Sequence, residues 1–399
     1  MRNIPSRWAA LVLAIALIVY GSLYPFTFDW QSLWHPDRSS FPFSWYLKRP
    51  LPADLIVNIL FYVPFGAALA SFLPRRWSVG IAVVAAAFIA GIASAALETL
   101  QHAVIARDPS LTDVVLNILS AVLGLTMARV YGDINVRRLK WVRHGQLPML
   151  PAALVFLWLA IHCVPFVPDL GLYKLAVHWQ EFLGSDLSGA QVAYFFAMTL
   201  IVVTAIRASV SRDYFWRALA IVVAAGLGAR LLVRGQVLEW NECIAWILAL
   251  PVAVTTRTIP WRQTRLPIFV LSLLAVALYG LLPFDLETFA RPFYWSPMSG
   301  FLESDQASGY RSFMEKLLVY GGLLWVSSAT AGSLVLGCAA LVLTSLTVEF
   351  CQRYMPGRVA EITDPLMVLL LALFMLSSAF RGRAGGAERA RSQNHPSQI

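Results

Sequence analysis

The sequence predicts an all-α protein, a polytopic transmembrane helical bundle of about twelve spans arranged as three parallel four-helix repeats. The 399-residue chain is 58% hydrophobic and only 13% charged, with a mean hydropathy of +0.66. A soluble domain is about 45–50% apolar and about 25% charged. The apolar residues gather in long runs, and the basic residues gather between alternate runs. This composition excludes a cytosolic enzyme, a disordered regulator and a secreted disulfide scaffold.

Twelve apolar runs approach the length of a spanning helix, which is about 20 residues. The first run follows Arg2 and Arg7 but precedes no small-residue cleavage site, so we expect an uncleaved span. The seventh run carries Arg230 and is the weakest of the twelve. The predicted spans are Trp8–Leu23, Leu55–Leu73, Val79–Leu97, Val114–Ala128, Met149–Val167, Ala190–Ile206, Ala218–Val233, Cys243–Thr256, Leu266–Phe284, Leu317–Ala329, Ala331–Val348 and Pro365–Phe380.

Charge between the spans predicts their orientation. With the N-terminus inside, the inward segments hold 19 of the 31 Lys and Arg residues but only three of the 22 Asp and Glu residues. The inward side is then +16 and the outward side −7. Short loops rich in Lys and Arg face the cytoplasm. The sequence therefore predicts that both termini are cytoplasmic, and it assigns the net charge of +9 to topology rather than to nucleic-acid binding.

Polar residues indicate an internal duplication. Four of them recur at a constant offset of 251 residues, and Pro25-Phe26 recurs as Pro283-Phe284 at an offset of 258. Such identities at fixed spacing are hard to assign to apolar composition alone. The four recurring pairs are Glu98 with Glu349, Gln101 with Gln352, Arg107 with Arg358, and Asp113 with Asp364.

The duplication divides the chain into units. Residues 1–131 form a first four-helix unit, and residues 266–380 form a second recognisable one. Residues 148–257 are a degenerate middle unit, in which Arg234 lies near the arginine spacing but Trp240 occupies the aspartate spacing. Four spans per unit keep every unit in the same orientation, so the repeats are parallel. Residues 381–399 are rich in Gly, Ala, Arg and Ser, and we expect a disordered cytoplasmic tail.

The recurring polar residues gather at one end of the predicted helices, on the outer face. Asp113 and Asn117 are four residues apart and share a helix face, and Glu98 and Gln101 are three apart. Ionisable groups in spans usually face the bundle interior or a watery cavity. The candidate ligand-binding residues are Asn58, Glu98, Gln101, Arg107, Asp113, Asn117, Glu349, Gln352, Arg358 and Asp364.

The pattern Asp54-x3-Asn58-x5-Pro64-x-Gly66, followed by Glu98-x2-Gln101-x5-Arg107-x5-Asp113-x3-Asn117-x6-Gly124, resembles the VanZ-like membrane family. Residues 279–380 resemble it more loosely, because Lys316 replaces Asn58 and Val368 replaces Asn117. The resemblance implies a bacterial envelope protein with about four spans per unit. Its name member is associated with teicoplanin resistance. The duplicated or triplicated arrangement departs from a simple family member and argues against that role here.

Two interpretations of the Glu98, Arg107 and Asp113 cluster stay open. The cluster either pins helix ends together as an ion network or binds a ligand. Two acids for one base leave one negative charge uncompensated. A purely structural network would be expected to contain equal numbers of acids and bases. The loss of an amide at Val368 favours a structural role in the later copy.

No metal site or cofactor is predicted. His102 adjoins the cluster, but Arg353 stands in its place in the later copy. The four cysteines have no close spacing, and the sequence has no phosphate-binding loop or nucleophile elbow.

The favoured function is a bacterial inner-membrane protein that binds or handles a cell-envelope component, for example a lipid-linked glycan precursor, at the outer face. Arg107 and Arg358 would meet an anionic headgroup, since a guanidinium matches phosphate oxygens in a bidentate way. The alternatives are a membrane enzyme with Glu98 or Asp113 as general base, and a transporter or scaffold of an exopolysaccharide system. The expected partners are the lipid bilayer and such a headgroup. The aromatic outer loops would anchor at the interface or stack on sugars.

Overall fold

The computed structural model describes residues 4–23, 26–30, 52–74, 76–104, 109–133, 149–164, 172–233, 235–299 and 306–376. These residues are largely helical, with two isolated β-bridges. The chain divides into two compact units, Met1–Asn135 and Val136–Ile399. The predicted tail at 381–399 and Arg107 lie outside the described residues.

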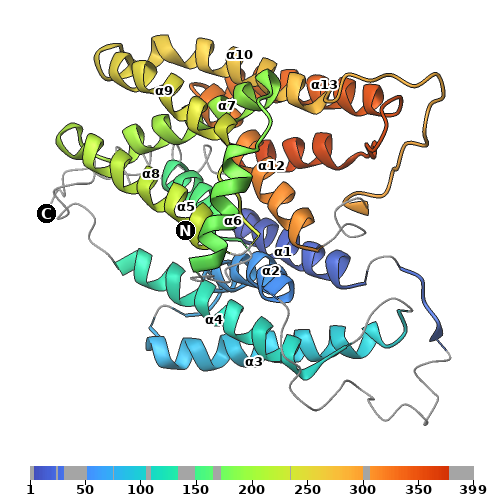
Figure 1. Cartoon of the computed structure of the whole chain (residues 1–399). Coiled ribbons are helices and arrows are strands. Elements are labelled where there is room, and N and C mark those ends of the chain that lie inside the picture. The colour runs from blue at the N-terminus through green and yellow to red at the C-terminus, as the bar shows by residue number, and fades with distance from the viewer. Residues whose placement is uncertain are drawn as a thin grey trace, which may run out of the picture. The chain divides into compact units, whose positions relative to one another are not determined.

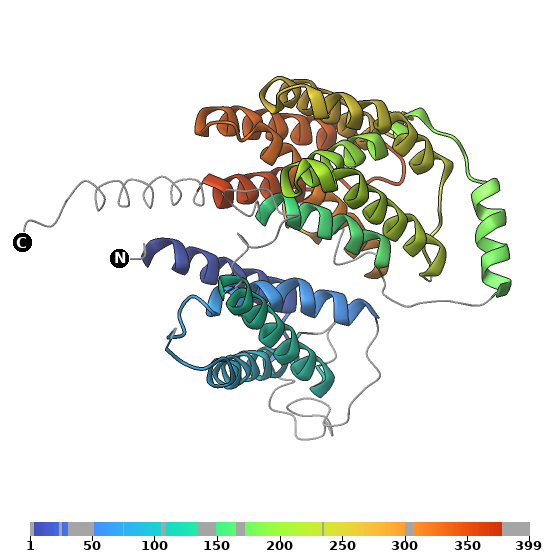
Figure 2. The same cartoon turned by 90° about the vertical axis from the view of Figure 1, so that its left-hand side faces the viewer.

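The first unit contains four helices, which Figures 1 and 2 show together: α1 (Ile4–Leu23), α2 (Pro52–Leu69), α3 (Val79–Gln101) and α4 (Leu111–Asp133). α4 packs against both α2 and α3, and α1 packs against α2. The Ser78 hydroxyl begins α3 by accepting a hydrogen bond from the Ile81 amide at 3.3 Å. Ala82, Ala86 and Ala90 are fully buried, and their four-residue spacing places them on the face of α3 that packs inside the bundle.

Two glycines let α2 and α4 touch backbone to backbone. A Cβ atom added at Gly66 would lie 1.9 Å from the Ala121 carbonyl oxygen, and one at Gly124 would lie 2.0 Å from the Val63 carbonyl oxygen. Small residues permit such close approach between helices in a membrane. Gly66 and Gly124, both part of the sequence motif, therefore serve helix packing.

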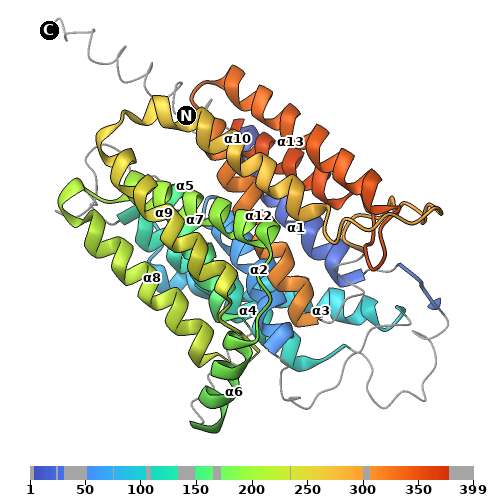
Figure 3. The ribbon, with the colours of Figure 1, turned by 45° about the horizontal axis from the view of Figure 1, so that its top comes forward.

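The second compact unit, Val136–Ile399, contains the rest of the described helices and so includes both the predicted middle unit and the predicted later copy. Its elements are α5 (Met149–Cys163), α6 (Leu172–Leu183), α7 (Gly189–Ser209), η3 (Arg212–Tyr214), α8 (Phe215–Leu232), α9 (Trp240–Thr258), α10 (Trp261–Gly280), α12 (Gln306–Ser327), α13 (Ala331–Gln352) and a helix at Thr363–Leu376. α7 is central: it contacts α5, α8, α9, α10 and α12, and it is continuously buried from Ala197 to Ile206. α10 packs against α12 and α13, and Figure 3 shows α10 and α13 side by side.

Each of the twelve predicted spans coincides with one of these helices. α6 was not predicted. It is a short amphipathic helix that projects away from the other helices of its unit (Figures 2 and 3). Near its end the Phe182 ring lies 4.2 Å, centroid to centroid, from the Trp240 ring.

Six of the described helices are long and apolar enough to cross a membrane: Val79–Gln101, Leu111–Arg129, Gly189–Ser209, Arg212–Leu232, Gln263–Gly280 and Ala331–Gln352. Many of their apolar side chains point outward, such as Val84 and Phe88 on α3 and Leu336 and Leu343 on α13. An outward apolar surface suits a lipid bilayer. The protein is therefore a multi-pass membrane protein, and the full count of twelve spans stays a prediction.

Candidate functional site

In the first unit, the predicted polar residues lie together at one end of the helices. Glu98, near the end of α3, accepts a hydrogen bond from the Ser110 amide at 2.9 Å. Asp113, in the first turn of α4, accepts from the Ser110 hydroxyl at 2.7 Å and from the Asn58 side chain at 3.5 Å. These bonds join α2, α3 and α4, so the cluster ties helix ends together.

Two amides add further links between helices of the first unit. The Gln101 side chain donates to the Ser22 carbonyl oxygen of α1 at 2.8 Å. The Asn117 side chain donates to the Ser94 hydroxyl at 2.9 Å. Each predicted amide in this unit therefore bonds to another helix. Arg107, predicted as the cationic centre, lies outside the described residues.

Two of these bonds have equivalents at the corresponding positions of the predicted later copy. Glu349 accepts from the Glu361 amide at 2.8 Å, with the same twelve-residue separation as Glu98 and Ser110. The Gln352 side chain donates to the Gly280 carbonyl oxygen at 2.7 Å, as Gln101 does to Ser22.

The loops after the first helix of each copy also correspond. Phe26 and Phe284 have positive φ angles of 63° and 64°. The Asp29 amide donates to the Ala103 carbonyl oxygen at 2.6 Å, and the Glu287 amide donates to the Tyr354 carbonyl oxygen at the same distance. The offsets of 258 and 251 residues thus relate backbone geometry as well as sequence.

The two copies differ in how they hold the helix-start aspartate. Lys316, in place of Asn58, forms an ion pair with Asp364 at 2.6 Å. The Tyr320 hydroxyl donates to the other carboxylate oxygen of Asp364 at 2.7 Å. Val368, in place of Asn117, is fully buried. The later aspartate therefore has a strong cationic partner of its own.

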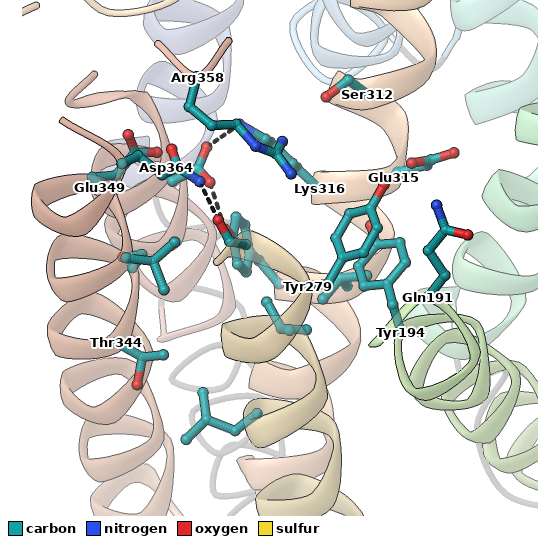
Figure 4. A pocket seen from close by; sticks show the side chains of 18 of the residues that line it. Gln191, Tyr194, Tyr279, Ser312, Glu315, Lys316, Thr344, Glu349, Arg358 and Asp364 are labelled. Atoms are coloured by element: carbon teal, nitrogen blue, oxygen red, sulfur yellow. Dashed lines mark hydrogen bonds and ion pairs between the residues drawn. The ribbon is translucent and has the colours of Figure 1, made fainter. Parts of the chain in front are cut away.

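The later copy also lines a pocket of about 450 Å³, drawn in Figure 4. Its walls come from α7, α10, α12, α13 and the loop before the last helix. Glu349 and Thr344 lie along one wall and Gln191 and Tyr194 along the opposite one, with Tyr279 between them (Figure 4). Four predicted ligand-binding residues line the pocket: Glu349, Gln352, Arg358 and Asp364.

Sequence reasoning missed the rest of the pocket lining. Arg311 and Glu315 pair on α12 at 2.9 Å, and Tyr194 stacks on Tyr279 with ring centroids 4.0 Å apart. Glu239, the residue before α9, lines the pocket as well. The charges at 311 and 315 stand just before an apolar run, but α7 and α10 are brought together only by the tertiary fold.

The middle unit contains a buried ion cluster that the sequence analysis did not single out. Arg230 on α8 is 1% exposed, and its guanidinium lies 3.0 Å from Glu242 of α9. His162, at the end of α5, approaches the other carboxylate oxygen at 2.6 Å. The Gln236 side chain donates to the Val164 carbonyl oxygen. The cluster therefore joins α5, α8 and α9.

A spacing signal could have located this cluster. Arg230 and Glu242 are twelve residues apart, as are Gln101 and Asp113 in the first copy. Glu242 lies in the first turn of α9, two residues beyond Trp240, the position at which the predicted repeat spacing places the aspartate. Arg234, near the expected arginine, lies outside the described residues.

The described residues hold no group of three or more His, Cys, Asp or Glu side chains suited to a metal ion. All four cysteines are free.

The fold and the polar helix ends define a multi-pass helical membrane protein. Residues 8–132 match the family model described as VanZ/LLP1. The N-terminal unit is therefore VanZ-like, in agreement with the resemblance carried by its polar motif. No curated protein and no solved structure matches the chain.

Proposed function

We propose that the pocket of the later copy binds the polar headgroup of an amphipathic cell-envelope component, such as a lipid-linked glycan precursor, at the outer face of a bacterial inner membrane. The single observation that carries this proposal is the gradient of polarity within the pocket. Charged groups gather at the C-terminal end of α13 and in the N-terminal half of α12, and apolar groups follow along both helices.

The gradient follows from the helix positions of the lining residues. On α13, Gln352 and Glu349 stand at the helix end, whereas Leu341 lies eleven residues earlier, about 16 Å along the axis. On α10, Leu273 and Val276 continue the apolar part below Tyr279. A ligand with a polar head and an apolar tail fits such a pocket better than a fully water-soluble one.

Arg358 supplies the contact for an anionic headgroup. Its Nε donates to the Leu282 carbonyl oxygen at 3.0 Å, and the side chain lines the pocket. Within the described part of the chain, its two terminal nitrogens have no hydrogen-bond partner. A guanidinium held at one nitrogen still presents two donors to a phosphate oxygen pair.

The packing of the first two helices of each copy also supports the proposed duplication. A Cβ atom added at Gly21 would lie 2.8 Å from the Phe61 ring, which is buried. At the offset of 258, Tyr279 takes the place of Gly21 and Val319 that of Phe61. A glycine beside a ring in the first copy is thus exchanged for a ring beside a valine in the later copy, where both side chains line the pocket. The middle unit would be a degenerate third copy.

The alternatives of a membrane enzyme, a transporter or an exopolysaccharide scaffold gain no specific support from the described residues. Transporter sites lie near the bilayer midplane. The charged part of this pocket lies at the C-terminal end of α13 and in the N-terminal half of α12 instead.

Filling the pocket tests the proposal. We expect Val319→Phe to abolish co-purification of a bound lipid, measured by mass spectrometry, and to abolish complementation of an envelope defect in a deletion strain. Thr344→Trp, on the opposite helix, is a second filling variant. Val335→Phe makes the same change on the exposed face of α13 and should retain both properties. Lipid binding and full complementation by both well-folded filling variants would contradict the proposal.

A further inference from the structure

We infer that the headgroup bound in this pocket carries one phosphate and one ammonium group, so that the ligand is a zwitterionic lipid. This inference rests on the proposed function, and it names the chemistry of the same site. It follows from the charges on the pocket walls that have no partner on the protein.

Most of the charged side chains around the pocket are matched. Lys316 pairs with Asp364 at 2.6 Å, and Arg311 pairs with Glu315 at 2.9 Å. Glu349 is only 3% exposed, and the Glu361 amide donates to its Oε2. The two ion pairs carry no net charge, and Glu349 is almost fully buried, so these groups leave little charge for a ligand to neutralise.

Arg358 is the pocket cation that has no ion pair with any described residue. It stands in the connection between α13 and the last helix, beside the wall formed by Glu349 and Asp364 (Figure 4). Only its Nε is engaged by the described residues, through the Leu282 carbonyl. This end of the pocket suits one phosphate group.

Among the described residues, Glu239 is an anion without an ion pair or side-chain hydrogen bond, and the two cations that it influences, Arg311 and Arg230, already pair with Glu315 and Glu242. Glu239 occupies the N-cap position of α9, and its side chain makes no capping hydrogen bond. Asn241, two residues further on, donates to the Gln191 side chain at 2.7 Å. That bond places the start of α9 beside the α7 wall, which Figure 4 shows opposite Glu349. This end of the pocket suits a cationic donor.

One cation and one anion on opposite walls select against other headgroups. An anionic lipid without an ammonium group would pair with Arg358. It would leave the Glu239 carboxylate without a cation, close to the negative charge of the lipid headgroup. A diphosphate would add a second negative charge with no unmatched cation to meet it. A headgroup that carries a phosphate and a primary ammonium satisfies both walls at once.

The test measures lipid selectivity of the purified full chain in detergent by native mass spectrometry. The probes are phosphatidylethanolamine, phosphatidylglycerol and a polyprenyl phosphate that carries an amino sugar. We expect the two ammonium-bearing lipids to be favoured over phosphatidylglycerol by about tenfold or more. Whichever of these two lipids binds more tightly shows whether the natural ligand is a phospholipid or a lipid-linked sugar.

Variants that remove one charge at a time distinguish the contribution of Arg358 to lipid binding from that of Glu239. Arg358→Gln should weaken all three lipids. Glu239→Gln should weaken the ammonium-bearing lipids and leave phosphatidylglycerol unchanged or stronger, which removes the selectivity. The matched controls are Arg291→Gln and Glu287→Gln, which alter an exposed ion pair outside the pocket and should change nothing.

Two different failures can be told apart. If no lipid binds the wild-type chain above the level of Val319→Phe, the proposed function itself is wrong. If lipids bind and Val319→Phe blocks them, but phosphatidylglycerol binds as well as the others and Glu239→Gln alters nothing, only the zwitterion inference is overturned.

Discussion

In the proposed function, ligand binding depends most directly on Arg358. Its Nε bond to the Leu282 carbonyl fixes the guanidinium plane, and lysine cannot reproduce that planar fork. The charge alone would survive in Arg358→Lys, whereas the geometry would not.

We therefore expect both Arg358→Lys and Arg358→Ala to impair complementation of an envelope phenotype, with little change in thermal stability in detergent. Arg107→Lys and Arg107→Ala are the matching changes in the first copy. Full complementation by both Arg358 variants would refute a functional role. Loss of folding in Arg358→Ala with complete rescue by lysine would show a structural role instead.

The buried Arg230–Glu242 pair is a structural feature at the same scale. Removing one partner of a buried ion pair costs about 3–5 kcal/mol, because the other charge stays buried without its counterion. We expect Arg230→Met to lower the unfolding temperature strongly, and Arg230→Met with Glu242→Leu to recover much of the loss. Arg291→Ala breaks an exposed pair and should cost about 0–1 kcal/mol. Equal losses for the single and the double variant would show that the charges themselves are not the cause.

Residue identity explains which parts of the site could be predicted. A charged or amide residue is conspicuous in an apolar chain, and its recurrence at constant spacing makes it more so. This signal predicts Glu349, Gln352, Arg358 and Asp364. Tyr194 and Glu239 were not found, since they come from the middle unit and carry no repeat signal. Val368, in place of an amide, favours a structural role for the later copy, yet residues of this copy line the pocket.

At the scale of elements, helix positions followed well from apolar runs, because twelve runs gave twelve helices. α6 was not predicted because a twelve-residue amphipathic helix is too short and too polar to be recognised by the apolar runs that mark spanning helices. Which helices pack against each other could not be predicted, because apolar composition does not distinguish one helix face from another. The detailed shape of the packed side chains selects the pairs.

The α2–α4 contact is the element pair most sensitive to side-chain size. A methyl group at Gly66 would meet the Ala121 backbone at 1.9 Å, so the helices must separate. We expect Gly66→Ala to lower stability by about 1–3 kcal/mol, as overpacking does. Gly80→Ala on α3, with nothing within 4 Å of the added atom, should cost nothing. The measurement is thermal unfolding in detergent, and equal stability of the two variants would contradict the close packing.

At the scale of the whole molecule, charge segregation predicts which side of the membrane the pocket faces. Arg129, at the opposite end of α4 from Asp113, donates to the Leu73 and Pro74 carbonyl oxygens at 3.2 and 3.1 Å. Basic residues thus occupy the end of the first unit away from its acidic cluster. The same separation of charge is expected of the cytoplasmic and outer faces.

Labelling of single cysteines in a cysteine-free background tests this orientation in intact cells. We expect a membrane-impermeant reagent to reach positions in 29–50 and 286–310 and to miss positions in 132–146. Lysed cells, in which all three segments should react, are the control. Reaction at 132–146 in intact cells would reverse the orientation and place the pocket on the cytoplasmic side.

The central claim is that the later copy holds an amphipathic ligand by its headgroup. The most direct measurement is an experimental density map of the full chain purified with its native lipids. We predict elongated density whose head lies between Arg358 and Glu239 and whose tail runs past Tyr279 toward Leu273 and Leu341. A pocket filled by protein side chains, or ordered lipid found only on the outer surface of the helices, would contradict the account.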